Sequence, residues 1–406
     1  TRGVSEEEAF LLSVKRLGSA QEMAGFADVP AEQVWRQLIV LDDAADRRGR
    51  GREVGLVVAL AALSVLLSKI PFLAGRPFLH NEELYLVNAS FFLFPSVAIY
   101  LIWKRGLRWP YMLFGAGVFA ISAVLINIYP TVAPGHTQIL TAIHTPILLW
   151  LCIGVLYCGP GWRRADLRLD FVRWSGEAFI YGVLVLLGIF VLATILQMMF
   201  GFLAIDVNDF SREWILTGLV YATPVVAVFL VERKKSIIES MAPVLAKIFT
   251  PLFFLTIAAL LAAMAASGLS LQADRELLIG FDLLLAVVLG LVLYTMSARD
   301  PGASPSLWDA VVLALIAAAL LADAIALVAI ARRLAEFGFS ANKTAALGEN
   351  IALLGNLLLV GIGYARFMAG GVEYKRVIRI QTGYLPVYAA WAAVVAFGFP
   401  PVFGWG

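Results

Sequence analysis

Runs of about 20 apolar residues, separated by short polar segments, recur along the chain from about residue 54 to its end. An α-helix of that length crosses the hydrocarbon core of a bilayer. The pattern therefore predicts an all-α fold, a polytopic transmembrane helix bundle of about eleven spans. The predicted spans are residues 54–73, 85–103, 109–129, 138–158, 177–203, 214–231, 243–267, 278–297, 307–331, 345–367 and 384–403.

The first 46 residues follow a different, amphipathic pattern. Ser5 and the three glutamates after it are typical of a helix start, and a second amphipathic helix is expected after Pro30. We therefore predict a short cytoplasmic helical segment at residues 1–46 and a transmembrane domain at residues 47–406. Four arginines just before the first span are expected to anchor it at the membrane surface: Arg47, Arg48, Arg50 and Arg52.

The distribution of basic residues predicts the orientation of the chain. An odd number of spans puts the two termini on opposite sides of the membrane. Loops on the side of the N-terminus are much richer in Lys and Arg, which predicts a cytoplasmic N-terminus and a C-terminus on the other side. The loop at 332–344 is the exception, because its basic residues Arg332, Arg333 and Lys343 fall on the side that is otherwise poor in them.

Composition narrows the classes of partner. The chain is 61% hydrophobic and 15% charged, with a formal net charge of +2, so the lipid bilayer is the expected surrounding and no nucleic-acid partner is expected. The two cysteines, Cys152 and Cys158, and the three histidines have no metal-binding or redox spacing. Since nucleotide-binding and nucleophile motifs are also missing, the sequence predicts no cofactor and no metal.

Ionisable side chains inside apolar runs are the candidates for function, since each costs roughly 2.5–3.5 kcal/mol to insert into a membrane. Asp323 is the acid with the most apolar surroundings. Glu349 and Asn356 are seven residues apart and so share one helix face two turns apart, with Asn350 beside Glu349. This polar stripe is expected to bind a cation or relay a proton, or else to fix helix packing through hydrogen bonds.

Two further side chains extend this candidate site. Lys247 is the basic residue well inside an apolar run, where it is expected to pair with Asp323 or Glu349, or to extend to the membrane surface instead. His144, two residues before Pro146, is expected to accept a proton or simply to pack through a hydrogen bond. Asp309 is expected to be interfacial.

Two stretches resemble known families. Residues 5–20, SEEEAFLLSVKRLGSA, with FADV at 26–29 and VWR at 34–36, resemble the C-terminal part of the permease prefix domain, also called the HAAS signalling domain. The stretches GFSANKTAALGEN at 338–350, YLPVYAAW at 384–391 and FPPVFG at 399–404 resemble a bacterial family of multi-spanning membrane proteins, domain of unknown function 4153. This second resemblance implies the bacterial inner membrane and no assigned reaction.

Three classes of function remain open. The first is a secondary transporter or permease for an unidentified ion or small solute, using the intramembrane acids. The second is a signalling or regulatory membrane protein whose residues 1–46 couple to a cytoplasmic protein partner. The third is a membrane enzyme acting on lipids, for which the sequence offers no nucleophile or metal cluster, and the oligomeric state is not predicted.

Overall fold

A computed structural model describes residues 44–128, 135–202, 205–233, 241–267 and 275–404, although the side chains near some of these boundaries are not described. The predicted segment at residues 1–43 lies outside the described residues. The chain divides into two units, Thr1–Leu56 and Val57–Gly406, and the second contains the helical bundle.

The described part of the chain is helical throughout and contains no strand, which confirms the predicted all-α polytopic bundle. Ten of its helices are long and apolar enough to cross a membrane, and the described apolar part of an eleventh, Leu283–Ala298, is shorter. The longer helices are α4 (Ala44–Leu73), α5 (Glu82–Lys104), α6 (Trp109–Asn127), α7 (His136–Cys158), α8 (Ala165–Phe202), α10 (Thr217–Arg233), α11 (Met241–Ser267), α12 (Arg275–Ala298), α13 (Leu307–Phe337) and α14 (Ala341–Met368).

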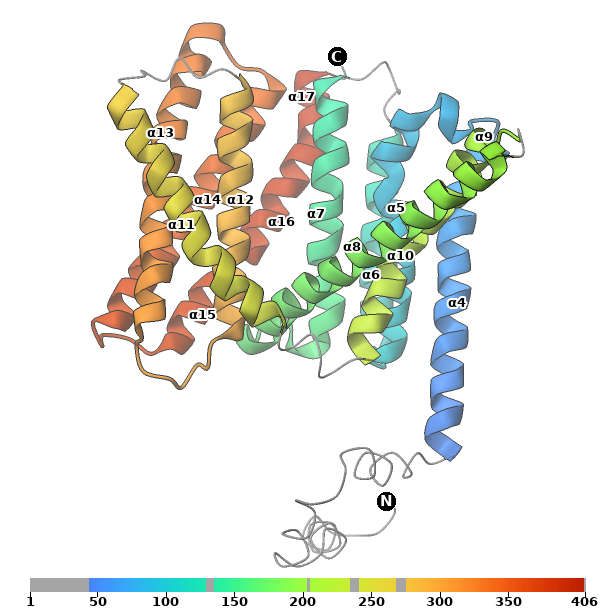
Figure 1. The fold of residues 1–406 in the computed structure, drawn as a ribbon, viewed down its shortest axis with the longest axis horizontal. Coiled ribbons are helices and arrows are strands. Elements are labelled where there is room, and N and C mark those ends of the chain that lie inside the picture. The colour runs from blue at the N-terminus through green and yellow to red at the C-terminus, as the bar shows by residue number, and fades with distance from the viewer. Residues whose placement is uncertain (1–43, 129–134, 203–204, 234–240, 268–274, 405–406) are drawn as a thin grey trace, which may run out of the picture. The chain divides into compact units, whose positions relative to one another are not determined.

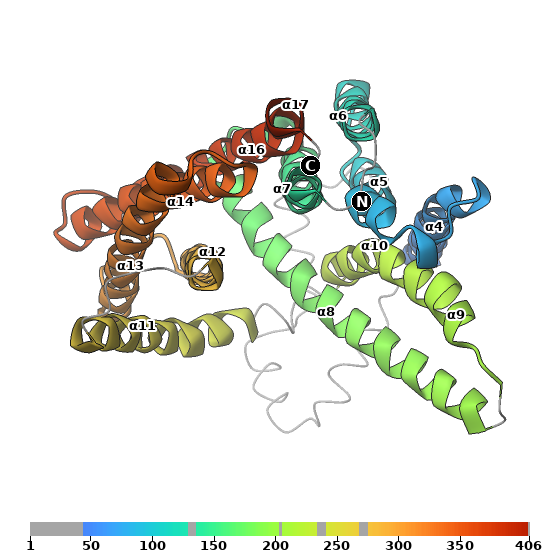
Figure 2. The same ribbon diagram turned by 90° about the horizontal axis from the view of Figure 1, so that it is seen from above.

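Helix α8 is longer than the span predicted for it. Its 38 residues correspond to about 57 Å at 1.5 Å per residue, well beyond the ~30 Å of a bilayer core. The predicted span began at residue 177 because the first turns of α8 are polar, and hydropathy does not register a helix that continues outside the membrane. Figure 2 shows α8 running diagonally past α10, and α8 also contacts α12 and α15.

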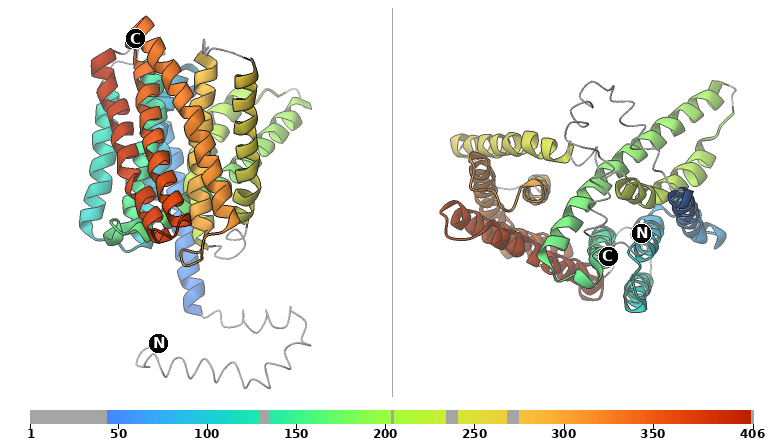
Figure 3. Two further views of the ribbon diagram at one scale, coloured as in Figure 1. Left: turned by 90° about the vertical axis from the view of Figure 1, so that its left-hand side faces the viewer. Right: turned by 90° about the horizontal axis from the view of Figure 1, so that it is seen from below.

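The helices of the bundle form two groups (Figure 1). Helices α5, α6, α7 and α10 pack together, and helices α11 to α14 form the other group. Helix α16 (Leu385–Ala393) packs on α7 and α14 and so joins the two groups, as the turned views of Figure 3 also show. The largest buried apolar cluster is in the second group and includes Leu315, Ile316, Leu357 and Val360.

The last membrane-spanning segment is broken into pieces. It consists of α15 (Tyr374–Gly383), α16, a π-helical stretch η5 (Val394–Gly398) and α17 (Phe399–Phe403). Pro386 starts α16 and Pro400 starts α17, because proline fits the first turn of a helix but not its interior. The predicted span at 384–403 covers α16, η5 and α17, and the amphipathic helix α15 precedes it.

A second π-helical stretch, η4 (Ser211–Leu216), follows the short helix α9 (Asn208–Phe210) and leads into α10. The 3₁₀ turns η2 (Phe78–His80) and η3 (Gly159–Gly161) complete the described elements. A π-helical turn inserts an extra residue into a helix and is frequent at functional sites. Both π-helical stretches in the described part of the chain lie in membrane-spanning segments.

Candidate functional site in helices α13 to α16

Asp323 lies on the face of α13 that packs against α14. A Cβ added to Gly361 of α14 would lie 3.1 Å from Ile316 of α13, and Ala329 of α13 clusters with partly buried residues near the start of α14. Asp323 is two turns beyond Ile316 and shares its face. The two helices are antiparallel neighbours, so Asp323 lies at the level of the middle of α14, with none of its surface exposed.

Asn356 lies beside the break between α15 and α16. A Cβ on Gly355 would lie 2.8 Å from the hydroxyl of Tyr384, the residue between those two helices. Gly363, two turns beyond Asn356 on the same face, lies against Ile380 of α15. The register thus puts Asn356 at the level of the last residues of α15.

Two amide side chains at this level are enclosed and unsatisfied. Asn356 and Gln381 each have 0% of their surface exposed. Within the part of the chain that the structure describes, neither the oxygen nor the nitrogen of either amide has a hydrogen-bond partner. The other buried polar residues of α15 have partners: Thr382 donates to the Ile378 carbonyl at 2.9 Å, and the Tyr374 hydroxyl lies 2.7 Å from that of Tyr364 in α14.

Glu349 and Asn350 lie about two turns before Asn356 in α14. Asn350 is fully buried and donates from Nδ2 to the Ala346 carbonyl at 3.0 Å, while Glu349 is partly buried. The exposed face of α14 carries Ile351 and Leu358, so the polar residues point away from it. Glu349, Asn350 and Asn356 therefore extend over two turns of α14, and Asp323 of α13 lies at the level of the turns between Asn350 and Asn356.

His144 approaches these residues from α7. It is 5% exposed, and its Nδ1 lies 2.8 Å from the Leu140 carbonyl. Leu140 packs against a buried cluster that includes Ala341 and Ala345 of α14, and His144 is one turn further along α7. Lys247 is part of α11, but its side chain lies outside the described residues, so its pairing with an acid stays a prediction.

Two buried ion pairs lie outside the predicted site. Lys69 and Glu213 are each 5% exposed, with 3.6 Å between Lys69 Nζ and Glu213 Oε1. Asp309, expected to be interfacial, is 1% exposed and receives two hydrogen bonds from Arg299, of 2.7 and 3.1 Å. The sequence held one signal for the second pair, the S-x-x-D capping box from Ser306 to Asp309 at the start of α13.

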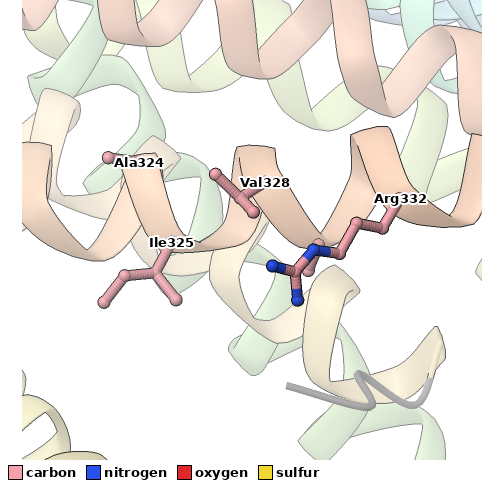
Figure 4. Close-up of a pocket in the computed structure, with 5 residues that line it drawn as sticks. Ala324, Ile325, Val328 and Arg332 are labelled. Carbon is pink, nitrogen blue, oxygen red and sulfur yellow. The ribbon is translucent and has the colours of Figure 1, made fainter. Parts of the chain in front are cut away.

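A pocket of about 410 Å³ opens on another side of α13. Figure 4 shows Ala324, Ile325, Val328 and Arg332 along its wall, and Ala329 completes the lining. Asp323 does not line this pocket, whose wall is apolar apart from the arginine. Among the residues with described side chains, no group of three His, Cys, Asp or Glu is arranged to hold a metal ion.

No protein-family model, curated protein or solved structure matches this chain. The fold alone therefore defines the class to which the protein belongs. It is a multi-pass α-helical integral membrane protein, with buried polar side chains among the helices of its C-terminal half.

Proposed function

We propose that the chain is a permease that moves a proton or another small cation through the polar layer formed by α13, α14 and the broken α15–α16 segment. The observation that carries this proposal is the pair of buried, unsatisfied amides Asn356 and Gln381. An amide taken out of water without a hydrogen bond costs roughly 2–7 kcal/mol, depending on the reference state. A ligand that forms the missing hydrogen bonds would offset that cost.

The break in the last span gives the ligand a place to bind. In membrane transporters, discontinuous helices free backbone groups to act as ligands. Here α15 ends at Gly383 and α16 begins at Leu385, next to both Asn356 and Gln381. Irregular backbone at membrane depth is tolerated where it is buried in protein or lines a cavity.

Charge selects the ligand. Asp323 is the acid of this layer, and a carboxylate within a membrane favours a bound cation or takes up a proton. Asn356 and Gln381 offer amide oxygens, which are ligands for hard cations, and amide nitrogens, which hold a water or a carboxylate.

The test is cation flux into proteoliposomes at a clamped membrane potential, measured for protons and for sodium. Wild type is expected to carry one of the two, and Asp323→Asn, Glu349→Gln and Gln381→Leu to lower that flux at least tenfold. Asn127→Ala is the matched control. Asn127 is also a helix asparagine, at the end of α6, but it lies outside the site and donates a hydrogen bond of 2.7 Å to Asn88 of α5. Wild-type liposomes that carry neither ion would overturn the proposal.

A further inference from the structure

The pocket on α13 combines an apolar wall with one cation. Its lining residues are spaced along a single stripe of the helix, from Ala324 to Arg332. Eight residues of helix correspond to about 12 Å, most of the ~15 Å depth of one leaflet. Ala324 and Ala329 leave room along this stripe, while Val328 remains 52% exposed. The pocket therefore has the length and the chemistry of a site for part of an acyl chain.

The charge lies at the end of the stripe nearest the membrane surface. Arg332 is five residues before the end of α13, and Figure 4 shows its side chain extending along the helix toward Val328. Arg332 is exposed, and Arg333 and Lys343 lie near it in the sequence. These three basic residues belong to the loop at 332–344, which the predicted orientation puts on the side of the membrane where the other loops have few basic residues. A basic residue at a membrane surface attracts anionic headgroups, and Arg332 is the one of the three that lines the pocket.

We propose that this pocket binds one anionic phospholipid, whose acyl chain occupies the stripe from Ala324 to Ala329 and whose headgroup phosphate pairs with Arg332. Charge complementarity selects the occupant, because a zwitterionic lipid adds a cationic group next to the arginine. The site is separate from the polar layer around Asp323, which does not line the pocket. Its test therefore does not depend on transport.

The experiment is native mass spectrometry of the purified full chain, titrated with phosphatidylglycerol or phosphatidylcholine of identical acyl chains. Wild type is expected to bind phosphatidylglycerol about fivefold more tightly, the size expected for one arginine near a membrane surface. Arg332→Gln is expected to remove this preference. Arg366→Gln is the matched control, since Arg366 is an exposed arginine in the last turn of α14 and outside the pocket.

A second variant tests the apolar wall. Val328→Trp keeps the arginine but fills the pocket, so it is expected to weaken binding of both lipids. Equal affinity for the two lipids in wild type, or equal loss in Arg332→Gln and Arg366→Gln, would overturn the proposal. Displacement of the bound lipid by millimolar inorganic phosphate would also overturn it, because it would indicate a site for a free anion. A lipid-free wild-type dimer that Val328→Trp converts to a monomer would overturn it as well, because the pocket would then bind a second copy of the chain.

Discussion

Lys69 and Glu213 are 144 residues apart in the sequence and form an ion pair inside the bundle, with 3.6 Å between Lys69 Nζ and Glu213 Oε1. The lysine also donates to Thr217 Oγ1 at 2.9 Å and lies 4.7 Å from the centre of the Trp214 ring. Glu213 belongs to the π-helical stretch η4, so the pair ties the end of α4 to the start of α10.

Removing one member of this pair is expected to destabilise the protein strongly. In Glu213→Gln the buried lysine loses its counter-charge, which costs about 3–5 kcal/mol. The double variant Lys69→Met/Glu213→Gln strands no charge, so its loss should be smaller than that of the single variant. Thermal unfolding in detergent micelles measures the stability of Glu213→Gln, Lys69→Met and the double variant. A loss of stability in the double variant equal to the sum of the losses in the two single variants would contradict this account.

Replacing Arg299 by lysine is expected to destabilise the Arg299–Asp309 ion pair. Arg299 binds both carboxylate oxygens of Asp309, and its guanidinium lies 4.2 Å from the centre of the Tyr374 ring. A lysine cannot form the two-pronged contact or stack in the same way, so Arg299→Lys should lower the free energy of unfolding by about 1–3 kcal/mol.

Arg164→Lys is the control for that measurement. Arg164 also pairs with an aspartate, Asp166, but both side chains are largely exposed. Exposed pairs contribute little to stability, so Arg164→Lys should unfold at the wild-type temperature. Two variants with the same unfolding temperature would show that burial does not distinguish these pairs.

The contact between α14 and α16 depends on a glycine. A Cβ at Gly348 would overlap the ring of Trp391, so Gly348→Ala should push the two helices apart and cost about 1–3 kcal/mol. Gly188 in α8 has nothing within 4 Å of an added Cβ. Gly188→Ala should therefore be neutral or slightly stabilising, as expected for replacing a helical glycine. The unfolding temperatures of the two variants test this contrast.

Asn356→Leu is expected to raise stability while it removes function. Both polar atoms of the Asn356 side chain are buried and lack partners in the described part of the chain, so a leucine of similar size removes a penalty of about 1–3 kcal/mol. If the amide is retained for a ligand, this gain comes with lost cation flux. A leucine variant that unfolds earlier than wild type would show that Asn356 has a structural partner.

The sequence predicted the helices well and their ends less well. Hydropathy located α5 within three residues of its ends, as 85–103 against Glu82–Lys104, because a helix in lipid must be apolar along its whole crossing. It missed the first twelve residues of α8 and the whole of α15, since both carry polar faces. A helix with a polar face has no long apolar run.

The same reasoning applies to the candidate site. The insertion cost of an acid in an apolar run singled out Asp323, and the spacing of seven singled out Asn356. Gln381 was missed because it lies in α15, where a glutamine in a polar sequence carries no signal. Lys69 and Glu213 were not among the predicted site residues, since nothing local in the sequence reveals that residues so far apart form a pair.

The sequence by itself thus determined that the chain spans a membrane many times and which polar residues had to be buried in doing so. It did this because the cost of placing each residue in lipid is local and additive along a helix. Only the tertiary structure decided which of those residues share a layer, because helix neighbours and registers depend on packing between distant segments. Gly348 lies against Trp391 of α16 and Gly361 against Ile316 of α13, and these contacts set the registers of the three helices.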